Sequence, residues 1–239
     1  MSAIYALGLL GIVAVLFLLL TIVFRAEKRA VWPFGELEAT PAFGDPSGYA
    51  TRWVNEATQS GWRMLGWARH LGSGTAAFRV NYAIMVSPQH DTIAVIGTGM
   101  VFERIPLQAT WLWTPTAEGR TVYSTDNQSG VQIDLSRDCK GQLAPAPAFG
   151  LLAAQHQAWM RGLVVMPAGQ FTPGHEFAEL QAMRQEHFRA MERAGLIRYA
   201  DALATHFHFT FWGAARTATW SYLVGMLRAL TGGRIPRTA

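Results

Sequence analysis

The hydrophobic pattern of the chain begins with a long apolar stretch. From Ile4 to Phe24 the sequence IYALGLLGIVAVLFLLLTIVF is almost wholly apolar, and residues 1–24 carry no charged side chain. A helix of 21 residues rises about 31 Å, which matches the ~30 Å hydrocarbon core of a bilayer. The pattern predicts a transmembrane helix. A cleaved signal peptide fits less well, because the run is too long, no basic stretch precedes it and no small-residue cleavage site follows at the right distance.

Beyond this stretch the pattern changes to short alternating runs, which are typical of strands. Five runs follow one another between Gly61 and Asp126, separated by the turn sequences LGSGT, PQHD, ERIP and PTAEG. The second run places its large apolar side chains on one face: Phe78, Val80, Tyr82, Ile84 and Val86. Its other face holds Arg79, Asn81, Ala83 and Met85. The alternation predicts a sheet buried on one side, and the short connections favour an antiparallel meander of about five strands.

Helical spacing appears at several further places. Asp45-Pro46-Ser47 predicts a helix start, with the helix over about 47–60, and apolar periodicity predicts helices over 149–164 and 175–194. The sequence THFHFTF predicts a strand, and the apolar block after it predicts a helix that contains Arg216. Because of that charge, we expect an amphipathic helix on the membrane or on a partner rather than a second span.

Together these elements predict an α+β fold with an N-terminal transmembrane helix, an antiparallel sheet with flanking helices, and a C-terminal strand plus amphipathic helix. We expect five segments: a transmembrane anchor (1–24), a proline- and glycine-rich linker (25–46), an α+β domain containing the sheet (47–144), a helical segment (145–198), and a strand with a basic docking segment (199–239).

Charge predicts the orientation of the anchor. Arg25, Lys28 and Arg29 follow it directly, and no basic side chain precedes it. The positive-inside rule therefore predicts a single-pass protein of the bacterial inner membrane, with its N-terminus outside and the bulk of the chain in the cytoplasm. From residue 195 onward five arginines accompany one aspartate. Such a segment suits an anionic membrane face or an acidic partner, and the absence of a basic stripe or a recognisable module argues against nucleic acid.

Aromatic content points to contacts. The chain has nine tryptophans and only 15% charged residues, which fits either a surface used for contacts or a tryptophan-rich core. The candidates for contact with the membrane or a partner are Trp32, Phe34, Trp212, Arg216, Trp220 and Arg228.

Candidates for binding chemistry are few. A polar run follows a predicted strand directly: Thr125, Asp126, Asn127, Gln128 and Ser129. Small polar groups at a strand end either bind a ligand or form ordinary turns. His206 and His208 share one face of a predicted strand, and His175 and Glu179 lie one helical turn apart, but neither pair has the further ligands of a metal site.

Catalytic motifs are missing from the sequence. Gly97-Thr98-Gly99 lacks the third glycine of a dinucleotide fingerprint, and Cys139 with His156 is an arbitrary cysteine–histidine spacing. We therefore expect no catalytic residue, no metal and no intrinsic cofactor.

The order anchor, linker, sheet resembles the single-span H subunit of purple-bacterial photosynthetic reaction centres. More broadly, it is similar to accessory subunits that brace bacterial reaction centre–light-harvesting complexes. No sequence motif is shared, and the helices predicted at 149–194 depart from the H-subunit pattern. The resemblance implies a non-catalytic accessory subunit of an energy-transducing membrane complex, with lipids or pigments of neighbouring subunits at its contacts. Two alternatives stay open: a membrane-tethered enzyme or small-ligand-binding domain with a site near Thr125–Ser129, and a lipid-binding protein of the membrane surface.

Overall fold

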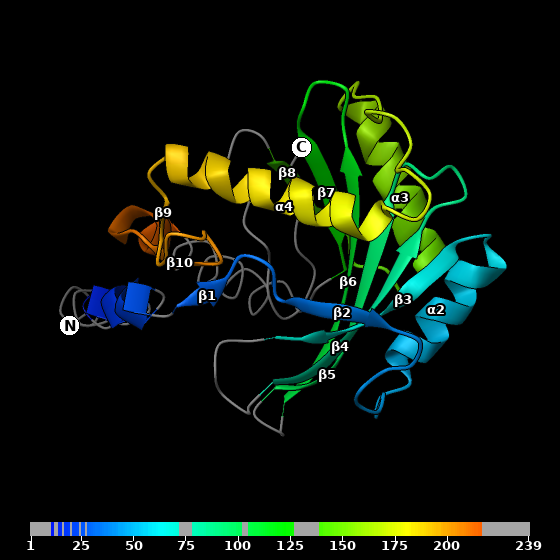
Figure 1. Ribbon diagram of the computed structural model, residues 1–239, viewed down its shortest axis with the longest axis horizontal. Coiled ribbons are helices and arrows are strands. Elements are labelled where there is room, and N and C mark those ends of the chain that lie inside the picture. The colour runs from blue at the N-terminus through cyan, green and yellow to red at the C-terminus, as the bar shows by residue number, and fades with distance from the viewer. Residues whose placement is uncertain are drawn as a thin grey trace, which may run out of the picture. The chain divides into compact units, whose positions relative to one another are not determined.

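The computed structural model describes residues 28–71, 78–101, 105–126 and 139–216, together with separate positions between 11 and 26. The chain divides into two compact units (Figure 1). We call Ala30–Ala190 the sheet unit, and we call Met1–Arg29 with Met191–Ala239 the terminal unit.

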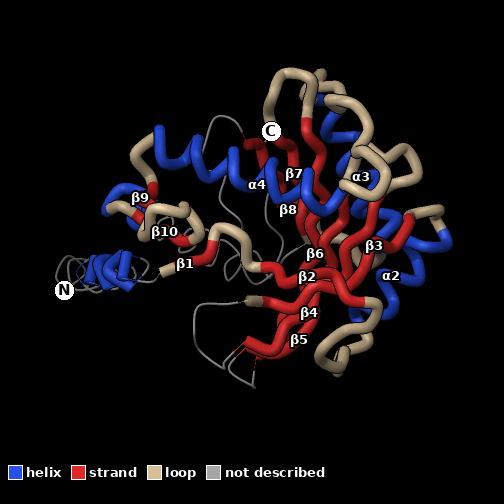
Figure 2. Tube along the Cα trace, viewed as in Figure 1, coloured by secondary structure: helices blue, strands red, loops and turns tan. Residues whose placement is uncertain are grey.

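The described part of the sheet unit is built on seven strands in the order β2-β3-β4-β5-β6-β7-β8 (Figure 2). Their bounds are β2 Phe34–Glu38, β3 Arg63–His70, β4 Phe78–Val86, β5 Ile93–Val101, β6 Ile105–Pro115, β7 Thr121–Thr125 and β8 Cys139–Leu143. Neighbours from β2 to β7 pair antiparallel, whereas β8 pairs with β7 in parallel. The predicted α+β class with an antiparallel meander is confirmed, and β3 to β7 are the five predicted runs.

The two edge strands were not predicted. β2 lies inside the segment predicted as a linker, directly after Pro33, whose carbonyl accepts a hydrogen bond from the Leu71 amide at 2.7 Å. A proline beside an edge strand is tolerated because it has no amide to leave unpaired. β8 lies after the last of the five predicted runs, where Gly141 leaves room for the Tyr123 ring that a Cβ would overlap.

Helices cover both faces of the sheet (Figure 1). α2 (Tyr49–Gln59) and α3 (Phe149–Gly162) cover one face of the sheet. The other face is covered by the residues of α4 (Glu176–Arg193) that belong to the sheet unit. Ala83 and Met85 are fully buried beneath α2 and α3. The expectation of a sheet buried on one side was therefore wrong, because the helices predicted after the sheet fold back onto its second face.

Hydrogen bonds fix the starts of α2 and α3. The Asp45 carboxylate accepts hydrogen bonds from the Thr51 amide at 2.8 Å and from the Thr98 hydroxyl of β5 at 2.7 Å. Burial raises the pKa of Asp45, but the hydrogen bonds from Thr51, Thr98 and Ser47 outweigh it and hold the pKa below its usual range. The Glu56 carboxylate of α2 accepts the Phe149 amide at 2.7 Å, which places a negative charge at the N-terminus of α3.

Replacing Asp45 with alanine is expected to lower the free energy of unfolding by about 1–2 kcal/mol, because the substitution removes the cap of α2 and leaves the buried Thr98 hydroxyl without its acceptor. Urea unfolding of the full-length protein measures the change. The matched control is Glu36→Ala at an exposed position of β2, with an expected change below about 0.5 kcal/mol. Equal effects of the two substitutions would show that Asp45 does not cap the helix.

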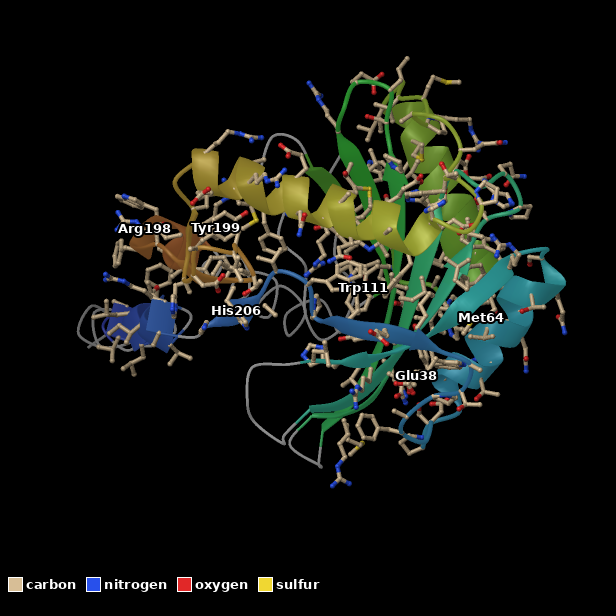
Figure 3. The ribbon with its side chains drawn as sticks, viewed as in Figure 1. Glu38, Met64, Trp111, Arg198, Tyr199 and His206 are labelled. Carbon is tan, nitrogen blue, oxygen red and sulfur yellow. The ribbon has the colours of Figure 1, made fainter. Side chains whose placement is uncertain are left out.

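The terminal unit contains a small sheet in the order β1-β10-β9 within its described residues. The strands are β1 Arg29–Ala30, β9 Ile197–Tyr199 and β10 His206–Phe209, the last being the predicted C-terminal strand. Figure 3 shows Arg198, Tyr199 and His206 on the antiparallel pair β9–β10. Phe207 and Phe209 are buried and pack edge to face at 5.4 Å, and the Arg29 guanidinium lies 5.2 Å from the centre of the Phe209 ring.

The predicted transmembrane helix and the predicted C-terminal amphipathic helix are only partly described. Positions 11–26 are helical where the structure describes them, and residues 211–216 form helical turns after β10. No helix within the described residues is long and apolar enough to cross a membrane. Most of the predicted anchor, residues 1–24, lies outside those residues, as do Trp220 and Arg228.

Candidate functional site

The terminal unit exposes large apolar side chains. In its N-terminal helical positions Val15, Leu18, Leu19, Ile22 and Val23 are each between 51 and 60% exposed. After β10, Trp212 is 74% exposed and Phe211 is 46% exposed, with their rings 5.7 Å apart. Soluble monomers rarely expose large apolar patches, so both segments are candidates for contact with lipid or protein.

Charge is divided between the two units. The terminal unit holds nine Lys and Arg against three Asp and Glu, a net charge of +6, whereas the sheet unit holds eleven against thirteen, a net charge of −2. Within the terminal unit Arg25, Lys28, Arg198 and Arg216 are exposed. The predicted contact residues Trp212 and Arg216 thus share an apolar and cationic environment that suits anionic surfaces.

Two predicted contact residues lie elsewhere. Phe34 of β2 is 7% exposed and belongs to the core of the sheet unit. Trp32 is half-buried and packs edge to face on Phe34 at 4.8 Å and on Phe177 at 5.1 Å. Because β2 joins the sheet, both rings turn onto the face beneath α4, and Phe34 has almost no surface left for a membrane or a partner.

The predicted ligand loop begins inside the core. Thr125 and Asp126 are buried, and Asn127, Gln128 and Ser129 lie outside the described residues. The Asp126 carboxylate accepts hydrogen bonds from the Tyr49 hydroxyl at 2.5 Å and from the Thr110 amide at 2.6 Å. Burial raises the pKa of Asp126 more than these hydrogen bonds lower it. The carboxyl group therefore ties α2 to β6 inside the protein rather than facing a ligand.

His156, which we considered only for its spacing from Cys139, is buried and joins α3 to the sheet. His156 Nδ1 lies 2.7 Å from the Ser124 hydroxyl, and His156 Nε2 lies 3.0 Å from the Thr114 hydroxyl. The Thr114 hydroxyl also lies 2.7 Å from that of Thr92, which donates to Asp91 at 3.0 Å. Ser124 has no exposed surface, so its pairing with histidine cannot serve attack on a substrate. The signal in the sequence was the set of serine and threonine residues on neighbouring strands, facing the helix that carries His156.

Burial dominates the ionisation of His156. It lowers the pKa to about 4, although the negative charge of Asp91 acts in the opposite direction. The imidazole is therefore neutral at physiological pH, and it can donate a hydrogen bond to one hydroxyl while accepting one from the other.

Two of the other predicted candidates, His206 and Glu179, are held by structural contacts. His206 Nδ1 lies 3.2 Å from the Asp201 carboxylate, and Glu179 accepts the Thr172 amide at 3.1 Å before α4. Glu176 forms an ion pair with Arg63 and accepts the Gly174 amide. Among the residues that the structure describes, no three or more His, Cys, Asp or Glu side chains are grouped to hold a metal ion.

Comparison of the chain with protein-family models, with curated proteins and with solved structures found no match. A function for this chain is therefore inferred from its own surfaces and contacts. Its two most informative features are the exposed aromatic pair of the terminal unit and the division of charge between the units.

Proposed function

We propose that the protein is a non-catalytic accessory subunit that braces an energy-transducing complex of the bacterial inner membrane. In this proposal residues 1–24 anchor the chain, the remainder of the terminal unit docks on lipid and neighbouring subunits, and the sheet unit lies in the cytoplasm. The observation that carries the proposal is the exposed Phe211–Trp212 pair within the positively charged unit.

The aromatic pair supports docking on energetic grounds. Burying about 150 Å² of tryptophan surface contributes roughly 4 kcal/mol at 25 cal/mol per Å². Arg216 follows Trp212 by four residues in the same helical turns, so both side chains lie on one helix face. An indole beside a guanidinium is a combination enriched at protein interfaces, and it also suits the headgroup region of a membrane.

The sheet unit supports a bracing role. Its helices already cover both sheet faces, and its central side chains are fully buried, so it needs no partner to complete its core. A folded unit of this kind can hold neighbouring subunits in position. A photosynthetic reaction centre–light-harvesting complex is the specific form of the proposal, supported by the layout of anchor followed by sheet, with lipids or pigments of neighbouring subunits at the contacts.

Gentle detergent extraction of native membranes, followed by a native gel and mass spectrometry, tests the proposal. We expect the chain to migrate with other membrane proteins in a particle much larger than its own 26.3 kDa. The control is the same sample after harsh detergent, which separates the chains. Migration of the gently extracted protein as a lone monomer would overturn the subunit proposal.

A further inference from the structure

One face of the β9–β10 pair is cationic. Arg198 of β9 lies directly opposite His208 of β10 in the antiparallel register. Side chains directly opposite each other in antiparallel strands share a face of the sheet, so the guanidinium and the imidazole lie side by side. Arg198 is exposed and His208 is half-buried, whereas Ile197, Phe207 and Phe209 of the opposite face are buried. The pair therefore turns an apolar face inward and a cationic face to the surface.

The donors of this face are available. Within the described part of the chain, the side chains of Arg198 and His208 have no ion pair and no hydrogen bond. The nearby carboxylate of Asp201 accepts hydrogen bonds from the Thr205 amide at 2.9 Å and the Thr205 hydroxyl at 3.0 Å, and it lies 3.2 Å from His206 Nδ1. The hydrogen bond from the Thr205 amide is the first cause that holds the pKa of Asp201 below its usual range. Asp201 is thus engaged with its own turn, and the guanidinium and the imidazole are left for an external anion.

The exposed aromatic pair Phe211–Trp212 is fixed to this small sheet. The Thr210 amide donates to the Leu196 carbonyl just before β9 at 3.0 Å, and the Thr210 hydroxyl accepts the Gly213 amide at 3.1 Å. Gly213 lies so close to the Leu196 carbonyl that a Cβ would overlap its oxygen. The turn that joins β9 to β10 exposes a further apolar side chain, Leu203, at 84%. Large apolar groups and a cationic face therefore belong to one folded structure.

We propose that Arg198 and His208 bind the phosphate of an anionic phospholipid headgroup. The planar guanidinium matches two phosphate oxygens, and an imidazole N–H can donate to a third. A lipid is favoured over a free phosphate because exposed apolar side chains adjoin the cations, and because Arg25 and Lys28 follow the predicted anchor in the same unit. A zwitterionic headgroup fits less well, since it carries a cation of its own. The inference rests on the membrane location in the proposed function and adds the chemical class of the lipid.

Native mass spectrometry of the full-length protein, released from detergent micelles, tests the proposal. The probes are phosphatidylglycerol and phosphatidylcholine with identical acyl chains at equal concentration, so that only the headgroup differs. We expect phosphatidylglycerol to bind at least about threefold more than phosphatidylcholine. Arg198→Gln with His208→Gln is expected to lower this ratio at least about twofold, with Arg25 and Lys28 supplying the remainder. Arg198→Lys keeps the charge and should lower the ratio less.

The matched control is Arg161→Gln with His175→Gln, which removes one arginine and one histidine from exposed positions of the sheet unit and should keep the native ratio. Melting curves verify that each variant is folded. Equal binding of the two lipids, binding of neither, or an unchanged ratio in the Arg198→Gln, His208→Gln variant would overturn the proposal.

The native gel separates this proposal from the subunit proposal. The Arg198→Gln, His208→Gln variant should stay within the large particle. Its loss from the particle with an unchanged lipid ratio would assign the face to an acidic neighbouring subunit and overturn the lipid site. Migration of the native protein as a lone monomer would contradict the subunit proposal but leave the lipid ratio as it is.

Discussion

Replacing Val15 and Leu18 together with arginine is expected to remove about nine-tenths or more of the chain from the membrane fraction. Each arginine near the middle of a span costs about 3 kcal/mol, and each lost apolar residue about 0.3 kcal/mol, so the pair costs roughly 7 kcal/mol. The whole span gains only about 5 kcal/mol from its apolar residues. Alkaline carbonate extraction followed by immunoblotting measures the change.

The matched control places the same two charges on the sheet unit. Val164 and Met166 are 87 and 69% exposed, so Val164→Arg with Met166→Arg changes the same number of exposed apolar side chains. This control is expected to stay in the carbonate-resistant fraction. An anchor variant that resists carbonate as well as the native chain does would contradict a transmembrane role for residues 1–24.

Lowering the pH from about 7 to about 4.5 is expected to cost the native protein roughly 2 kcal/mol of folding free energy through His156 alone. In the folded protein His156 stays neutral until about pH 4, whereas the unfolded chain binds a proton below about pH 6.5. The unfolded state therefore binds more protons in this window, and stability falls as the pH falls through it. Urea unfolding in detergent micelles, followed by tryptophan fluorescence at a series of pH values, gives the slope of the free energy of unfolding against pH.

His156→Gln isolates this contribution, because glutamine keeps a donor and an acceptor for Ser124 and Thr114 but does not titrate. We expect the His156→Gln variant to have a lower free energy of unfolding than the native protein at pH 7. We also expect that free energy to fall less as the pH is lowered. His175→Gln at an exposed position is the control and should keep the native slope. The half-buried His70, whose pKa burial also lowers, acts in the same direction as His156 but is present in every variant. Identical slopes for His156→Gln and the native protein would show that His156 does not carry the effect.

Local patterns explain how much of the fold could be predicted. β3 to β7 follow one another through short turns, so each pairing is set by neighbouring sequence. The apolar stripe of α4, and the end of this helix near Gly195, which has φ +69°, likewise depend only on residues close together in the sequence. β2 and β8 are different, because each is a five-residue strand interrupted by a glycine and recognisable only by the distant strand beside it.

The candidate sites were harder to predict for the same reason. Tyr49 and Asp126 are 77 residues apart in the sequence, and Ser124 and His156 are 32 apart. A lone polar residue in an apolar run does not reveal its partner at such distances. Phe34 was predicted to be exposed because proline and glycine flank it, and only its place on β2 shows that it is buried. For Trp212 and Arg216 the structure confirms only the start of the predicted helix, over residues 211–216, and their contact with a membrane or a partner stays a prediction.

We propose that the exposed aromatic pair of the terminal unit holds the protein to its complex. The most direct measurement is a native gel of gently extracted membranes that carry Phe211→Ala with Trp212→Ala, beside membranes that carry Val164→Ala with Met166→Ala in the sheet unit. We predict that the first variant leaves the large particle while remaining in the membrane, and that the second variant stays within the particle. Retention of the first variant in a particle of unchanged mass would contradict the account.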